Sequence, residues 1–467
     1  MHEFYTYVWQ DTKRWFWRFL YKWTGITWLV GLFKWSGPLY PLRILIGKPA
    51  PVPFQDARGG FDIIDGPGLF EEERFRGFTE GHFYPVRIGD VLHDRYTIIA
   101  KLGYGLTSTV WLAGDLEDNM TVVLKVYIRD DYKEKFNHAQ NEIRAINTLM
   151  KIPTKHRGRK YLRDAISSFR LDGPNGEHTC IVQGPTWQTI EDLRKAHCGV
   201  LPPILVKVIL NRILPALDFL HTECKLIHTD IKGENIFQIF DKSAVKTVYN
   251  FAYAEMMHPS SRKYVDGKTI FASRRFSPPQ LLTDCVLGDF GAALAGDQER
   301  HHCAQPECFR APEVMLQADW SYPVDIWNLG VLVWYWVQGE VLFDGGDPKS
   351  TDDECRYSTR NHLANVISVL GFPPLDFVKR GRRSHEFFHQ NGLWRAKDFR
   401  PKSRPWDKRD LKLQGYENEL FLDFMRCMLR WRPEDRMTAA KLSEHPWINT
   451  YTDAEQDVMT NFVDDLE

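Results

Sequence analysis

The chain has 467 residues, of which 43% are apolar and 26% charged, and its formal net charge is −1. This length fits one large two-lobed domain with extensions, or two ordinary domains. The near-neutral charge gives no global indication of nucleic-acid binding, so an electrostatic preference must come from local patches. The 8 cysteines include no Cys-x-x-Cys pair. We therefore expect free thiols in a reducing intracellular compartment, cytoplasm or nucleus, and no disulfide framework.

The first 48 residues form an extension in which tryptophans alternate with scattered basic residues. Its longest uncharged run, residues 23–33, is much shorter than the roughly 20 residues that a membrane-spanning helix needs. No clear small-residue site for signal cleavage follows. Four interpretations stay open: an organellar presequence, an interfacial helix that contacts a membrane, packing against the main domain, or a mistaken start site.

The segment after this extension, residues 49–90, is rich in glycine, proline and acidic residues, which predicts a linker. Residues 451–467 form an acidic tail. Between them the apolar pattern changes from strand-like to helical. Strands are expected at 96–99, 110–113 and 120–127, and helices at 134–150, 204–222, 324–337, 361–370 and 419–430. This order predicts an α+β protein with a strand-rich first part and a helix-rich second part.

A glycine motif lies between the first two predicted strands. Residues 103–110 read Gly-x-Gly-x-x-Ser-x-Val, with Gly103, Gly105, Ser108 and Val110 at the defining positions. Glycines allow backbone amides to approach a phosphate closely, because no side chain intervenes. Alone, the motif is more often a simple glycine hairpin.

A lysine follows in the next apolar strand. A buried ammonium needs an anionic partner, so Lys125 within the run 122–125 implies a carboxylate or a phosphate nearby. Glu142, in the helix expected at 134–150, is a candidate for that partner. A Lys–Glu pair that holds the ammonium against ATP phosphates is the arrangement of protein kinases. The alternative is an ordinary surface lysine.

The strongest signal is the His-x-Asp-x-x-x-x-Asn pattern of residues 228–235. In a kinase catalytic loop, Asp230 accepts or orients the proton of the substrate hydroxyl, Lys232 neutralises charge on the transferred phosphoryl group, and Asn235 holds a metal ion. Asp289, in the Asp-Phe-Gly sequence of residues 289–291, supplies the second metal ligand.

These motifs occur in kinase order and are followed by Ala-Pro-Glu at residues 311–313. We therefore predict the two-lobed protein-kinase fold, with a small sheet-rich lobe at 91–185 and a large helical lobe at 186–450. Asp325 resembles the aspartate that braces the catalytic loop, and Arg436 resembles the arginine that pairs with Glu313. The rival interpretations are a pseudokinase or scaffold module and a small-molecule kinase.

Within the kinases, the chain resembles the SR-protein kinase family in a fungal-type version. Residues 83–90, 101–112 and 228–232, with the His-Thr-Asp form of the catalytic loop, carry this resemblance. It implies a monomeric serine/threonine kinase that uses ATP and Mg²⁺, acts on Arg/Ser-rich proteins, and does not bind nucleic acid directly. It also implies a nucleotide site lined by Leu102, Gly103, Gly105, Ser108, Val110, Lys125 and Glu142.

Some features depart from the family pattern. Gly233 replaces a proline and is expected to loosen the loop. Residues 236–286 form an insert in the large lobe, at the place of a longer family spacer. The acidic cluster at 344–354 is either a docking site for basic substrates or a solvated loop. Thr229 and an activation segment without serine, threonine or tyrosine predict activity without phosphorylation of that segment.

Overall fold

The structure is a computed structural model that describes residues 60–129, 137–240, 244–277, 283–298, 300–346, 357–395, 403–406, 409 and 411–451. The chain divides into two compact units. The small unit comprises Met1–Lys133, Ala165–Pro185 and Lys242–Ser277, and the large unit comprises Glu134–Asp164, Thr186–Asp241 and Pro278–Glu467. The tryptophan-rich extension, residues 49–59, most of the acidic cluster and nearly all of the tail lie outside the described residues. None of the described helices is both long and apolar enough to span a membrane.

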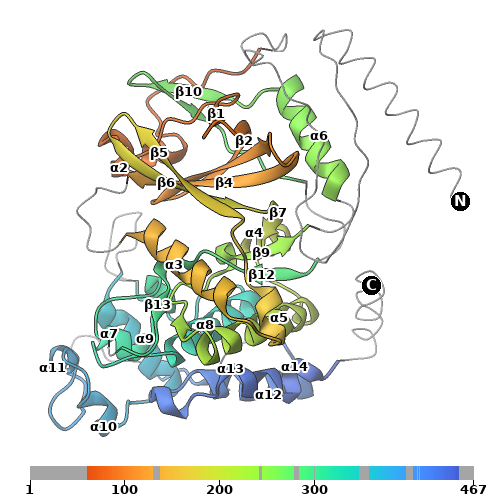
Figure 1. The fold of residues 1–467 in the computed structure, drawn as a ribbon. Helices are drawn as coiled ribbons and strands as arrows, with labels where there is room; N and C mark the ends of the chain where they lie inside the picture. The colour runs from red at the N-terminus through yellow and green to blue at the C-terminus, as the bar shows by residue number, and fades with distance from the viewer. Residues whose placement is uncertain are drawn as a thin grey trace, which may run out of the picture. The chain divides into compact units, whose positions relative to one another are not determined.

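The small unit is built on a six-stranded antiparallel sheet with the order β1-β2-β3-β4-β6-β5 (Figure 1). The three predicted strands are confirmed and are longer than expected. Buried Ile98, Ala113 and Leu124 of three successive strands belong to one apolar cluster. The strands are β1 (Val91–Leu92), β2 (Tyr96–Tyr104), β3 (Ser108–Asp115), β4 (Met120–Arg129), β5 (Ser167–Gly173) and β6 (Gly176–Gln183).

Residues 60–90 are part of this unit, which differs from the predicted linker. They form a 3₁₀ turn, η2 (Glu71–Arg74), and a short helix, α2 (Arg76–Thr79). Phe78 and Phe83 are buried and pack with Ile270 in one apolar cluster. The partner side chain lies about 190 residues further along the chain, so local composition did not reveal this packing.

The insert also differs from its predicted place, because its described residues 244–277 belong to the small unit and not to the large one. It forms a helix, α6 (Ala244–Met257), and an antiparallel hairpin of β10 (Arg262–Val265) and β11 (Lys268–Phe271). Figure 1 shows α6 beside the sheet, where it contacts β2. Phe271 at the end of β11 enters the apolar cluster of the sheet.

Three consecutive glutamates, residues 71–73, which we call the glutamate turn, join these parts. Glu71 and Glu72 both form ion pairs with Lys101 of β2, whose side chain is fully buried. Lys101 Nζ also donates to the carbonyl oxygen of Phe271 at 3.1 Å. Glu73 binds Lys263 of the hairpin at 2.7 Å. Because a buried ammonium requires such partners, the turn fixes both the insert and the strand that leads into the glycine motif.

The large unit is predominantly helical, and its five longer described helices agree with the predicted ones to within four residues at each end, whereas its shorter helices were not predicted. Its longer helices are α3 (His138–Lys151), α5 (Pro203–Thr222), α8 (Pro323–Gln338), α9 (Thr359–Leu370) and α12 (Gly415–Met428). Its shorter helices are α4 (Ile190–Ala196), α7 (Pro312–Met315), α10 (Leu375–Val378), α11 (Ser384–Phe387), α13 (Ala439–Ser443) and α14 (Pro446–Asn449). Its 3₁₀ turns are η3 (Arg157–Tyr161), η4 (Gly233–Asn235), η5 (Phe290–Ala292), η6 (Glu307–Phe309) and η8 (Pro433–Asp435), and its strands are β7 (Thr186–Thr189), β8 (Leu226–Ile227), β9 (Ile236–Ile239), β12 (Cys285–Leu287) and β13 (Leu294–Ala295).

One glycine of this unit is required by a close backbone approach. A Cβ atom at Gly158 of η3 would lie 1.9 Å from the carbonyl oxygen of Pro215 in α5. Pro215 lacks a backbone N–H, so it interrupts the hydrogen-bond ladder inside this long helix. The close packing places η3, and the chain that follows it, directly against α5.

A buried histidine gives the large unit a pH-dependent stability. Burial, with a smaller effect of the Arg310 charge, lowers the pKa of His362 to about 3. The folded protein therefore keeps His362 neutral, while the unfolded chain takes up a proton below about pH 6.5. Its contribution to stability is complete above that pH and declines as the pH falls toward 3.

Below about pH 6, we expect this histidine alone to lower the free energy of unfolding by about 1.4 kcal/mol for each unit by which the pH falls. Urea denaturation of the wild type and of His362→Phe at pH 7.5 and pH 5.5 measures this contribution. The wild type should lose more stability between the two pH values than the variant. An identical loss in both proteins would contradict the prediction.

Candidate active site

The catalytic-loop motif forms a hydrogen-bonded turn between β8 and β9 in the large unit. Lys232 Nζ lies 2.8 Å from Asp230 Oδ2, and Asn235 Nδ2 lies 2.9 Å from the same oxygen. Asn235 Nδ2 also donates to the Asp230 carbonyl oxygen at 2.9 Å. The structure thus brings the three predicted residues together, and the side chains of Lys232 and Asn235 both bond the same oxygen of the Asp230 carboxylate.

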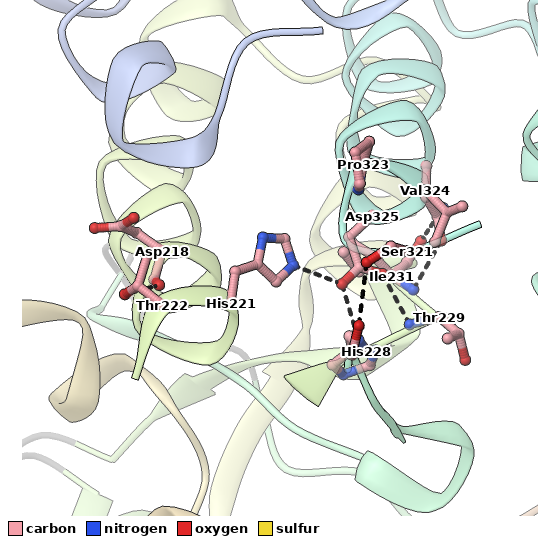
Figure 2. A network of polar contacts seen from close by, with 12 residues as sticks. Asp218, His221, Thr222, His228, Thr229, Ile231, Ser321, Pro323, Val324 and Asp325 are labelled. Atoms are coloured by element: carbon pink, nitrogen blue, oxygen red, sulfur yellow. Dashed lines mark hydrogen bonds and ion pairs between the residues drawn. The ribbon is translucent and has the colours of Figure 1, made fainter. Parts of the chain in front are cut away.

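The backbone of this loop is held by α8. The carboxylate of Asp325, which is fully buried, accepts hydrogen bonds from the N–H groups of His228 and Thr229, each at 2.8 Å. His221 of α5 contacts the same carboxylate at 2.9 Å (Figure 2). Asn328, one turn further along α8, bonds both the N–H and the carbonyl oxygen of Ile231. The predicted brace by Asp325 is confirmed.

The loop also holds the strand that leads to the Asp-Phe-Gly motif. β9 pairs with β12, with Ile236 opposite Leu287. Gly288 N–H donates to the Asn235 carbonyl oxygen at 2.9 Å, and His228 Nε2 lies 3.1 Å from the Gly288 carbonyl oxygen. Asp289 is the next residue, so the two predicted metal ligands, Asn235 and Asp289, extend from neighbouring strands.

Asp289 has a left-handed backbone, with φ 59° and ψ 73°. A non-glycine residue in this region costs of order 1–3 kcal/mol and persists only when its surroundings hold it. Asn141 of α3 contributes to that support, because its Nδ2 donates to the carbonyl oxygen of Gly291 at 2.9 Å and also to that of Ala293. The helix that carries Glu142 is therefore tied to the residues that follow Asp289.

Thr229 occupies a position where many kinases have an arginine. Its backbone is also left-handed, with φ 68°. Its hydroxyl donates to the carbonyl oxygen of Ala292 at 2.9 Å. The hydroxyl therefore connects the catalytic loop directly to the start of the activation segment, a neutral contact where a phosphate-binding charge would otherwise lie.

Gly233 is packed more tightly than its predicted loosening effect suggests. The residue is buried at the start of η4. A Cβ atom there would lie 3.0 Å from the side chain of Glu191 and 3.1 Å from its backbone nitrogen in α4. A larger residue would require α4 to move, so the glycine fits the close approach of this helix.

The nucleotide-binding candidates of the small unit lie on one hairpin and the strand beside it. Gly103 lies near the end of β2, and Gly105 lies in the β2–β3 turn, where its N–H donates to the Ser108 carbonyl oxygen at 2.8 Å. Val110 lies opposite Lys125 in the register of β3 and β4. Leu102 precedes Gly103 on β2. These residues belong to the small unit and Glu142 belongs to the large one, so the Lys125–Glu142 pair stays a prediction.

The donor atoms in the large unit suit a magnesium ion. Mg²⁺ prefers carboxylate and amide oxygens. The Asn235 Nδ2 atom is engaged with Asp230, which leaves the amide oxygen as the ligand atom of that side chain. The Asp289 carboxylate follows from the neighbouring strand. This pair of oxygen donors is chemically consistent with the predicted metal.

A buried ion pair holds the end of the activation segment. Arg436 Nη1 and Nη2 lie 2.6 and 2.7 Å from the two carboxylate oxygens of Glu313. Both side chains are almost fully enclosed. The predicted pairing is confirmed, and its bidentate geometry fixes the segment after the Ala-Pro-Glu motif.

Four supporting residues of the large unit were not predicted from the sequence: Asn141, Arg163, His221 and Asn328. Asn328 lies three residues after Asp325, which places both on one face of α8, so helical spacing could have identified it. Asn141 directly precedes Glu142, but neither it nor Arg163 belongs to a recognisable motif. Their contacts depend on the tertiary structure.

Comparisons with known proteins agree with this geometry. The protein kinase domain model matches residues 96–286 and 283–448. A serine/threonine protein kinase of Aspergillus fumigatus is 35% identical over 410 residues, 87% of this chain and 97% of that protein.

Two further relatives are also named as kinases. The serine/threonine-protein kinase SRPK of Physarum polycephalum is 30% identical, over 83% of this chain and 92% of that protein. Protein kinase dsk1 of Schizosaccharomyces pombe is 27% identical, over 84% and 88% respectively. These matches give no support to the pseudokinase alternative. The chain belongs to the protein kinase family and is a serine/threonine protein kinase of the SRPK-like type.

Proposed function

We propose that Asp230 is the residue that orients the substrate hydroxyl and takes its proton during phosphoryl transfer. Lys232 and Asn235 both bond Asp230 Oδ2. The other oxygen, Oδ1, is therefore the atom that receives the substrate proton as the hydroxyl oxygen attacks phosphorus. The Asp230 side chain is about one-fifth exposed, which leaves it accessible to a protein substrate. This shared use of Oδ2 is the observation that carries the assignment.

Membership of the kinase family implies ATP and, typically, Mg²⁺. We infer that Asn235 and Asp289 hold the metal through oxygen atoms. When bound, ATP and Mg²⁺ supply the γ-phosphoryl group and neutralise its charge. In the small unit, Gly103, Gly105 and Ser108 form the hairpin at which the backbone can approach phosphate closely, and Leu102 and Val110 provide apolar contacts. Lys125 then carries the positive charge toward the phosphates, with Glu142 as its partner.

Lys232 has a second role in this proposal. Its side chain is about one-third exposed while its ammonium contacts Asp230, so it can reach both the carboxylate and the transferred phosphoryl group. The residue keeps the carboxylate oriented before the substrate arrives and offsets the charge that forms during transfer.

We propose Arg/Ser-rich proteins as the substrate class, because relatives that match most of the chain are named as SRPK and as SRSF protein kinase 3. The acidic cluster that would receive arginines lies outside the described residues except for Asp344, whose carboxylate accepts from Asn365 at 2.8 Å. Free cysteines support an intracellular kinase, in the cytoplasm or nucleus. We also propose, from the sequence alone, that the protein is a monomer that does not contact nucleic acid. A membrane contact through residues 1–48 is a further proposal from the sequence.

A peptide series tests the substrate class. We expect serine peptides flanked by arginine to be phosphorylated with kcat/KM at least about tenfold above matched peptides with lysine, since arginine binds carboxylates in a bidentate manner. The full chain, ATP and Mg²⁺ are incubated with each peptide, and Asp230→Asn serves as the inactive control. Equal kcat/KM for the arginine and lysine series would reject the Arg/Ser assignment.

A further inference from the structure

Arg163 lies against the two strands that lead from the proposed metal ligands. Its backbone N–H donates to the Leu287 carbonyl oxygen at 2.8 Å, and Leu162 forms a parallel bridge with Leu287. These contacts attach the chain after η3 to β12, two residues before Asp289.

The side chain of Arg163 also lies against these two strands. A Cβ atom built at Gly288 would lie 3.0 Å from both Cβ and Cδ of Arg163. The guanidinium carbon is 4.4 Å from the centroid of the Phe237 ring. Phe237 lies in β9, two residues after Asn235, so the arginine spans β9 and β12, the strands next to Asn235 and Asp289.

The guanidinium remains a cation in this place. The residue is partly exposed as a whole, but its Nε atom has no contact with solvent. Burial lowers the pKa of Arg163 to about 10, and the charges of Glu142 and Asp289 act in the opposite direction. At neutral pH it is therefore a fixed positive charge within electrostatic reach of both carboxylates.

We propose that Arg163 is an internal countercharge to Glu142 and Asp289 that weakens metal binding at Asp289. The inference rests on the proposed function, in which Asp289 is a metal ligand. The two carboxylates are stabilised by the arginine when no metal is bound. A divalent cation that binds Asp289 is repelled by the same charge, so Arg163 is a positioning residue that also sets the concentration of metal required.

The test compares neutral and charged replacements by a direct binding measurement. Binding of Mn²⁺ to the full chain is followed by electron paramagnetic resonance in the presence of a non-hydrolysable ATP analogue. We expect Arg163→Met to bind Mn²⁺ about three- to tenfold more tightly than the wild type, because one nearby positive charge is removed. Arg163→Lys retains the charge and should stay within about twofold of the wild type.

The alternatives give different results. If Arg163 only fills space, both variants bind Mn²⁺ as the wild type does, which overturns the proposal. If it only shapes the site, Arg163→Met binds Mn²⁺ more weakly, which also overturns it. Should Arg163→Met fail to fold, the double variant Arg163→Gln/Glu142→Gln removes the Glu142 carboxylate as well, and its Mn²⁺ affinity is compared with that of Glu142→Gln alone.

Asp289→Asn separates this inference from the proposed function. Loss of Mn²⁺ binding in Asp289→Asn, together with unchanged binding in Arg163→Met, refutes only the countercharge. Wild-type Mn²⁺ binding in Asp289→Asn refutes the metal-ligand role itself, and the countercharge with it.

Discussion

Replacing Asp230 by asparagine should lower kcat by a factor of about 10²–10⁴, since a positioned general base contributes about that much. The asparagine oxygen can still accept from Lys232 and Asn235 at the place of Oδ2. The amide nitrogen then occupies the place of Oδ1, and it cannot accept a proton from the substrate. Nucleotide affinity should change little, because neither proposed metal ligand is altered. Steady-state turnover on a serine peptide and calorimetric ATP binding measure both quantities.

Asp423→Asn is a matched control for this change. Asp423 is an exposed aspartate of α12 that contacts His445 at 3.2 Å, remote in the sequence from the catalytic loop. It should retain wild-type kcat. Wild-type turnover in Asp230→Asn would remove the general-base assignment, whereas a parallel loss of ATP binding would indicate a disrupted site.

The second large effect is expected on stability, from Glu313→Gln. The substitution leaves the buried guanidinium of Arg436 without its charged partner. Loss of one member of a buried ion pair costs about 3–5 kcal/mol, because the remaining charge stays desolvated. Urea denaturation monitored by tryptophan fluorescence should show this decrease in the free energy of unfolding.

An exposed pair of similar chemistry provides the comparison. Arg170 and Glu177 lie 2.8 Å apart, with about half of each side chain exposed. Glu177→Gln should therefore cost less than about 1 kcal/mol. A similarly small cost for Glu313→Gln would show that burial does not determine the contribution of the Glu313–Arg436 pair.

The sequence predicted the helices and catalytic motifs well because their signals are local. α5 was expected at 204–222 and spans Pro203–Thr222, since its run of apolar residues is long and continuous. Asp230, Lys232 and Asn235 lie within six residues of one another, so their meeting in one turn depends little on the rest of the fold.

The parts that were not predicted depend on distant partners. Phe78 looked like one apolar residue in a segment rich in glycine and acid, and the distant side chain of Ile270 belongs to the apolar cluster that buries it. Lys101 appeared only as the residue before Leu102, yet its ammonium meets Glu71 and Glu72 in the interior. Arg163 stands in no motif, and its meaning comes from its contacts with Leu287, Gly288 and Phe237.

The discontinuity of the small unit has a consequence for synthesis of the chain on the ribosome. The hydrogen bond from Lys101 to Phe271 joins residues 170 positions apart. At about 5–20 residues per second, β11 emerges on the order of 10–30 s after β2. During that interval Phe78 and Phe83 lack the side chain of Ile270 that helps to bury them. The sheet therefore stays incomplete, with apolar surface exposed to chaperones, until residues 134–164 and 186–241 of the large unit have also left the ribosome.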